Sequence, residues 1–276
     1  MRYILSLAAC LLLASSALAG TRTPLPTNAE ASQLVTGTIE VGADGTLLHY
    51  AVDHPEKLDE GVLHVIDLSA AGWRFKPMVA TEKATMSLSI HASKDESGHY
   101  RTWVDSADFE PLPAQGVFWS WAKSTTPDYP SEALQAGVGG TVYLSLHVAR
   151  DGTVADVFVS RVDLDTEDKP VTMDHWRSVL GDVSAKVARS WRFRPPTNPL
   201  DEAVTLTVPV TFSPDWPQPK PRYGQWTGYF PGPFVPAPWL PAPETSSLRN
   251  ASALAANGIY PVKHNGPELA TPLGAN

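Results

Sequence analysis

The chain has 276 residues, 43% of them hydrophobic, which is enough to bury a core and suits one or two domains. Its formal net charge of −8 argues against nucleic acid as a partner, because nucleic-acid binding requires a basic surface. The one cysteine, Cys10, lies in the N-terminal apolar run, so the exported chain is expected to have neither disulfides nor cysteine-ligated metal.

The N-terminus has the pattern of an export signal. Arg2 precedes an apolar run, and Ala17-Leu18-Ala19 ahead of Gly20 forms a small-x-small cleavage site. At ~1.5 Å per residue, the apolar run is shorter than the ~30 Å hydrocarbon core of a membrane. We therefore expect residues 1–19 to be a cleaved signal peptide.

Two alternatives to cleavage stay open. The apolar run is retained as a membrane anchor in the first. In the second, a lipid is attached at Cys10, since Leu7-Ala8-Ala9-Cys10 has the form of a lipid-attachment box.

Two similar five-residue strings, Trp73–Pro77 and Trp191–Pro195, indicate an internal duplication. Each follows an Asp-Gly-Thr turn, at residues 44–46 and 151–153. Upstream of each Trp, a stripe of mostly apolar residues recurs with the same helical spacing. The two stripes are Leu58, Val62, Val65, Ser69 with Trp73, and Trp176, Leu180, Val183, Val187 with Trp191. We interpret both Trp side chains as core residues.

The first copy is predicted to span residues 37–109, after a polar lead-in. We expect a strand before the Asp-Gly turn, a second strand over 47–52, a helix over 56–71, and strands over 85–92 and 100–104. A connector over residues 110–126, with two prolines and two tryptophans, leads to the second copy.

The second copy is predicted to span residues 127–214. A short helix over 127–137 ends at Gly137, which suits a left-handed C-terminal position. Strands over 140–148 and 154–162 flank the second Asp-Gly turn, and a helix over 174–193 follows. The last strand alternates cleanly from Val204 to Phe212. Pro209 within it cannot donate to a ladder, so this strand is expected at a sheet edge.

The tail over residues 215–276 begins with densely interleaved prolines and aromatic residues. So much aromatic surface gains from burial at ~25 cal/mol per Å². We expect the tail to wrap back onto the two copies. The alternative is a segment that docks onto a partner.

Five motifs of the second copy, in this order, resemble the C-terminal domain of TonB proteins, the periplasmic energy transducers of Gram-negative bacteria. Their residues are Tyr129, Pro130 and Ala133; Gly140; Asp151 and Gly152; Trp191, Phe193 and Pro195; and Val208, Pro209, Val210 and Phe212. The first copy resembles a degenerate repeat of the same domain, in which Asp44-Gly45, Trp73, Phe75 and Pro77 are kept.

The resemblance implies an α+β fold of two small αββαβ-type units, each an antiparallel sheet packed by one amphipathic helix. It also implies a periplasmic location, no enzymatic activity, no cofactor, and a protein partner bound by β-strand addition. The family's partner is an outer-membrane receptor. The expected partner-binding residues form the last strand, with its threonines turned outward: Val204, Thr205, Leu206, Thr207, Val208, Pro209, Val210, Thr211 and Phe212.

Two features depart from the family. Its members usually keep a membrane anchor that contains a histidine, and a long Pro-rich spacer precedes the domain. Here the apolar N-terminal run has no histidine, and the Pro-rich segment follows the domain. The first functional hypothesis is therefore a TonB-like interaction module that supports receptor-driven transport across the outer membrane. The alternative is an anchor-free scaffolding protein of the envelope.

No catalytic or metal-binding motif is present. The chain has no Gly-x-Ser-x-Gly elbow and no Gly-rich phosphate loop. Its eight histidines are scattered without a metal-ligand spacing, and we interpret them as surface or hairpin residues. Neither a metal nor a small-molecule substrate is expected, and the sequence leaves the oligomeric state open.

The signal-peptide interpretation predicts a mature chain that begins at Gly20. Intact-mass measurement on the exported protein should show loss of residues 1–19. Retention of Met1 in a membrane fraction would instead identify an anchor, and a lipid adduct at Cys10 would identify a lipoprotein.

Overall fold

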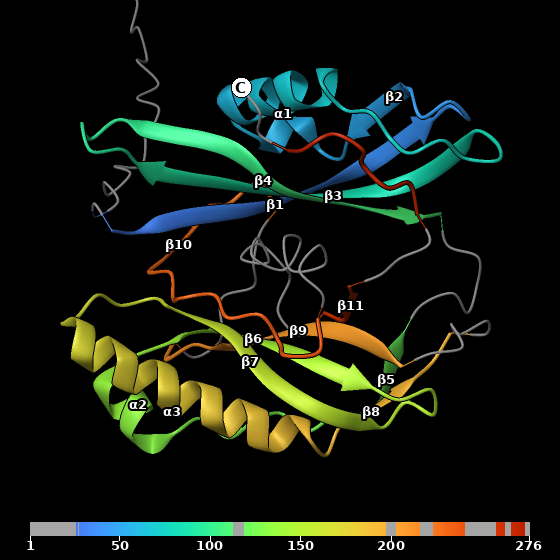
Figure 1. Cartoon of the computed structure of the whole chain (residues 1–276). Coiled ribbons are helices and arrows are strands. Elements are labelled where there is room, and N and C mark those ends of the chain that lie inside the picture. The colour runs from blue at the N-terminus through green and yellow to red at the C-terminus, as the bar shows by residue number, and fades with distance from the viewer. Residues whose placement is uncertain are drawn as a thin grey trace, which may run out of the picture.

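The computed structural model describes residues 26, 28–112, 119–196, 203–215, 223–240, 258–262 and 266–273. The predicted signal peptide lies outside these residues. Two antiparallel sheets lie one above the other, and each carries its long helix on the side away from the other sheet (Figure 1).

The first sheet has the strand order β10-β1-β3-β4, with β2 also paired to β1. Helix α1 (Glu60–Ala71) covers one face of this sheet, and a single 3₁₀ turn (Pro55–Lys57) precedes it. The strands are β1 (Glu30–Val41), β2 (Leu47–Val52), β3 (Glu82–Lys94), β4 (Tyr100–Pro111) and β10 (Thr227–Tyr229).

The second sheet has the order β11-β9-β6-β7, with helices α2 (Ser131–Ala136) and α3 (Pro170–Ala188) beside it. Its strands are β6 (Gly140–Val148), β7 (Val154–Leu164), β9 (Val204–Phe212) and β11 (Tyr260–Pro261). A two-stranded ribbon of β5 (Ser120–Lys123) and β8 (Arg192–Arg194) extends it. The α+β class and the antiparallel sheets agree with the sequence prediction.

Each Asp-Gly turn is closed by the Trp-Arg-Phe string of its own unit. The Phe75 N–H donates to the Gly45 carbonyl at 2.8 Å, and the Phe193 N–H donates to the Gly152 carbonyl at 2.8 Å. Both glycines have φ 83°, and a Cβ would lie 2.1 Å from the Phe75 oxygen or 1.8 Å from the Phe193 oxygen. Both positions therefore require glycine, for its left-handed conformation and for the close approach of the string.

Both Trp side chains are buried in a core, as expected. Trp73 is 1% exposed and donates to the Ser69 hydroxyl, whereas Trp191 is 3% exposed and donates to the Thr125 carbonyl. The buried faces of the helices are rotated from the expected stripes, because these faces centre on Ile66 in α1 and Leu180 in α3. The buried helical residues are Val62, Ile66 and Ala70, and Met173, Leu180, Gly181, Ser184 and Ala188.

Several element boundaries differ from the sequence expectation. The first strand begins at Glu30 instead of near residue 37, because the supposed lead-in pairs with β3 and with the tail strand β10. β4 continues to Pro111, beyond the expected 104. Helix α3 ends at Ala188, before the string that was assigned to its last turn. Residues 192–194 are extended, since they bond to the hairpin turn and to β5.

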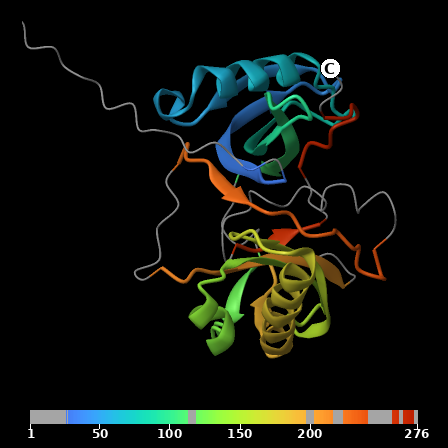
Figure 2. The same ribbon diagram turned by 90° about the vertical axis from the view of Figure 1, so that its left-hand side faces the viewer.

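The described parts of the tail lie against both units. β10 pairs with β1, Phe230 pairs with Leu164 at the end of β7, and β11 pairs with β9. Residues 268–270 then run beside the first Trp-Arg-Phe string, with a bridge between Phe75 and Leu269. Figure 2 shows the orange part of the tail, which includes β10, between the two sheets, and the last red stretch beside the first unit. The tail therefore wraps onto both copies.

We predict that Trp191→Ala lowers the free energy of unfolding by about 3–5 kcal/mol, because it empties a buried site. Val171→Ala is the matched control: Val171 lies on the same unit but is 81% exposed, so its loss should cost less than about 0.5 kcal/mol. Chemical denaturation measures both. Equal stability of the two variants would contradict the core role of Trp191.

Candidate interaction site

Strand β9 is held firmly on its inner edge. It pairs with β6 without a register shift, from Gly140↔Phe212 to Val148↔Val204. Leu206 and Val208 on its core face are 0% exposed, and Val210 is 3% exposed. This half of the strand belongs to the core of the second unit and is not available to a partner.

The outer edge of β9 is identified by one hydrogen bond. The Val262 N–H donates to the Thr205 carbonyl at 2.9 Å, so the backbone groups of Thr205 point away from β6. Alternate residues of a strand point their backbone groups to the same side, and Pro209 therefore has its nitrogen on this outer edge. The backbone N–H that Pro209 lacks would not have bonded to β6, so the ladder between β9 and β6 loses no hydrogen bond. Pro209 therefore lies on the outer side of β9. The strand itself lies between β6 and the short β11, so the prediction that it lies at the sheet edge is wrong for the part that β11 covers.

This outer edge is only partly open. β11 pairs with Leu206 and Thr207, whereas no strand among the described residues pairs with the outer side of Val208–Phe212. The threonines alternate with the core residues of β9, as expected, but only Thr211 is exposed, whereas Thr207 is 3% exposed. The face of the sheet opposite the helix is covered by the tail, and the Trp239 indole donates to the Thr205 hydroxyl.

The corresponding strand of the first unit has no such opening. β3 follows the first Trp-Arg-Phe string as β9 follows the second. β4 pairs with it from Ala84↔Pro111 to Lys94↔Tyr100. The two units therefore differ in the accessibility of this edge.

The remaining motif residues have structural roles. Tyr129 donates to the Val138 carbonyl at 2.8 Å, and its ring packs edge-on against Phe212 at 5.4 Å. Ala133 is fully buried, and a Cβ at Gly140 would lie 2.2 Å from the Asp163 carbonyl oxygen. Pro130 precedes the first residue of α2. Pro77 and Pro195 are the last residues of the two five-residue strings, the first exposed and the second half-buried.

A polar cluster between the two sheets has no counterpart in the sequence analysis. His91 is 2% exposed, in contrast to the expectation of a surface histidine, and it lies 3.5 Å from Asp105 and 3.8 Å from Glu30. From the tail, Tyr229 contacts the His91 ring, with its hydroxyl 3.2 Å from Nδ1. The guanidinium of Arg161, from the second unit, lies over the Tyr229 ring. These groups come from five different elements, so no local sequence motif predicts the cluster.

Arg161 of this cluster is paired with a buried carboxylate. Arg161 donates to Asp163 at 2.6 Å, and the same carboxylate oxygen accepts the Gly232 N–H at 2.9 Å. Burial lowers the pKa of His91 to about 4, so the ring is neutral near pH 7. The cluster joins the two units and the tail. It has no activated nucleophile.

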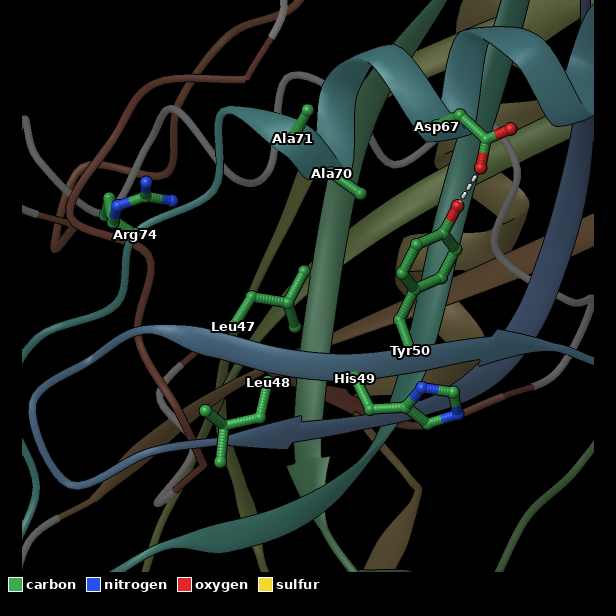
Figure 3. Close-up of a pocket in the computed structure, with 8 residues that line it drawn as sticks. All are labelled: Leu47, Leu48, His49, Tyr50, Asp67, Ala70, Ala71 and Arg74. Carbon is green, nitrogen blue, oxygen red and sulfur yellow. Dashed lines mark hydrogen bonds between the residues drawn. The ribbon is translucent and has the colours of Figure 1, made fainter.

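A groove on the first unit lies between α1 and β2 (Figure 3). Tyr50 donates to Asp67 across it, and burial together with this carboxylate raises the pKa of Tyr50 to about 12. Arg74 lies apart from this pair and donates to the Trp73 carbonyl. Because these polar groups are already bonded and do not converge, the groove has no catalytic arrangement.

Within the described ranges, no group of three or more His, Cys, Asp or Glu side chains is placed to hold a metal ion. In the same part of the chain, no helix is long and apolar enough to cross a membrane.

The geometry of the second unit is that of a small protein-interaction domain with one partly open strand edge. The family model of the Gram-negative bacterial TonB protein C-terminal matches residues 125–214, so this segment is similar to that family. No significant match to a curated protein or to a solved structure was found.

The match ends at Pro214 and does not include residues 30–111. The duplication therefore stays a hypothesis. It is supported by the matching turn closures, buried Trp side chains and strand order of the two units.

The buried His91 predicts an acid-dependent loss of stability. Its ring binds a proton at pH 6.5 in the unfolded chain and at about 4 in the folded one, so protonation favours unfolding. The free energy of unfolding should fall by up to about 3 kcal/mol between pH 6.5 and 4 through this group. His91→Gln removes this contribution, and urea denaturation at several pH values measures it.

Asp163 titrates in the same range, because burial raises the pKa of its carboxyl to about 6. Comparison of His91→Gln with the wild-type chain cancels that contribution. His99→Gln is the matched control, since its side chain is 82% exposed. A pH profile unchanged by His91→Gln would contradict the assignment.

Proposed function

We propose that the second unit binds an extended segment of an outer-membrane receptor in the periplasm, by strand addition to the outer edge of β9. The observation that carries this proposal is the outer side of Val208–Phe212, which pairs with no described strand. A strand edge of this kind offers N–H and C=O groups to an incoming strand. The similarity of residues 125–214 to the TonB C-terminal family supports a protein partner of this class.

The same edge of the first unit is closed by β4, so we assign docking to the second unit alone. The first unit then has a supporting role, joined to the second by the polar cluster and the tail. On this proposal the protein has no enzymatic activity, and it takes part in transport across the outer membrane through the receptor that it binds.

The alternative is an envelope scaffolding protein with no link to transport. The observation that favours it is the tail, which ties the two units together and occupies part of the β9 edge. Both functions use protein contacts only, and they differ in whether an outer-membrane receptor is bound.

Proline substitution at Thr205 and Thr207 tests the docking edge. Both residues share the outward parity of Pro209, so the double variant removes N–H donors from the outer edge and keeps the ladder with β6. Thr205→Ala/Thr207→Ala is the matched control, because it keeps both donors. We expect the proline variant to fold and to lose receptor binding. The alanine variant should lose much less.

The measurement is cross-linking in the periplasm from a photoreactive residue at Thr211, with folding monitored by circular dichroism. An adduct with an outer-membrane receptor, reduced at least about tenfold by the prolines, supports the proposal. No receptor adduct in any variant points to the scaffolding alternative. An adduct that the prolines do not affect excludes docking on the Thr205–Thr207 part of this edge.

A further inference from the structure

The outer edge of β9 is partly covered by this chain's own tail. Tyr260 lies opposite Thr207, Pro261 lies opposite Leu206, and the Val262 N–H donates to the Thr205 carbonyl at 2.9 Å. The tail segment Ile259–Val262 is therefore an added strand on the edge to which we assign docking. It lies outside the residues that match the family model, which end at Pro214.

The cap, as we name residues 259–262, fits this edge chemically. Val262 and Tyr260 share parity and point their backbone groups toward β9, so the Pro261 nitrogen points away and costs no ladder bond. Ile259 and Pro261 share the face of Leu206, and Ile259 packs against the core of the second unit. Tyr260 and Val262 lie on the opposite face, toward the other sheet.

We propose that the cap is an intramolecular stand-in for the partner segment, and that a partner docks on β9 by displacing it. This inference rests on the proposed docking function. It names the partner's chemistry: an extended segment with an aliphatic residue on the helix side of the sheet, and with proline tolerated opposite Leu206.

The cap is weakly held compared with the strand beneath it. It pairs with β9 at two positions, whereas β6 pairs with β9 at nine. The chain on either side is fixed elsewhere. Trp239 bonds to Thr205 upstream, and downstream the Lys76 N–H donates to the Glu268 carbonyl while the Ala270 N–H donates to the Arg74 carbonyl. The cap can therefore leave while the rest of the tail stays in place.

The open part of the edge provides a starting point for displacement. An incoming strand can pair first with the outer groups of Pro209 and Thr211, and then advance toward Thr207 as the cap leaves. The cap thereby sets a minimum length for a partner segment. A segment that pairs only with Pro209 and Thr211 forms few hydrogen bonds and leaves the cap in place. A segment that continues to Thr205 replaces every hydrogen bond that the cap loses.

Val262→Pro tests the cap without a partner. It removes the donor of the Val262–Thr205 hydrogen bond, whereas the control Val262→Ala keeps that donor and shortens the side chain. In the full-length mature chain, the amide protons of Thr205 and Thr207 should exchange faster in Val262→Pro than in Val262→Ala or wild type. A synthetic peptide of residues 257–264, added in trans, should bind Val262→Pro about three- to tenfold more tightly, the effect of one backbone hydrogen bond.

A disulfide between Thr207→Cys and Tyr260→Cys supplies the opposite test. The two residues are directly paired, at the ~5.5 Å Cα spacing that a disulfide accommodates. The only natural cysteine, Cys10, belongs to the predicted signal peptide. The oxidised form should bind neither the peptide nor the receptor, and reduction should restore both.

The outcomes separate the two proposals. Equal amide exchange and equal peptide binding in Val262→Pro, Val262→Ala and wild type would overturn the cap. Peptide binding by the oxidised chain at the wild-type level would overturn it as well. If the amide-exchange and peptide-binding results are as expected and no variant cross-links to a receptor, the displaceable cap is supported and receptor docking is contradicted.

Discussion

The alternation of backbone groups along β9 is the constraint on which the functional site depends. Each residue of a strand points its N–H and C=O to one side, so β9 has an inner set of groups bonded to β6 and an outer set that is left over. The interior of the unit depends on the inner set. Only the outer groups can form hydrogen bonds with the tail or with a partner. Pro209 is tolerated because its nitrogen lies on this outer side, where the bonds to β6 do not need it.

The two units solve the problem of an exposed strand edge in different ways. An unpaired edge invites uncontrolled association, and natural proteins therefore cover or shorten it. In the first unit, the next strand in sequence returns as a hairpin and covers the edge of β3 completely. In the second unit, the covering strand comes from the distant tail and is only two residues long. A short cover from a distant segment can be exchanged, whereas the long hairpin cannot.

The sheet faces that are turned toward each other explain why the two units pack together instead of forming two separate domains. Each sheet packs its apolar face under its own helix and turns a mostly polar face toward the other sheet. Buried polar groups must be bonded, and here Tyr229 and Gly232 of the tail supply several of the partners. The neutral His91 and the Arg161–Asp163 pair lie within this layer, so the tail stabilises the junction as well as covering the edge.

The sequence alone determined the local features of the second unit. The Asp-Gly turns, the alternation over residues 140–148 and 204–212, and the left-handed Gly137 at the end of α2 are set by neighbours along the chain, and the structure has them where the patterns predicted. The two Trp residues were also assigned correctly to the core, because their position after an amphipathic helix decides their burial. The family similarity of residues 125–214 followed from the same short motifs.

Only the tertiary structure decided what covers the polar faces and the strand edges. Strand β1 begins in a polar stretch because β3 and β10 pair with it. Thr207 is buried at a position where Tyr260 of the tail pairs with it. His91 is neutral because burial disfavours its charged form, and Tyr229 of the distant tail is one of the groups that cover it. Such pairings join residues far apart in the chain, and a local pattern holds no information on which distant segment will supply the missing hydrogen bonds.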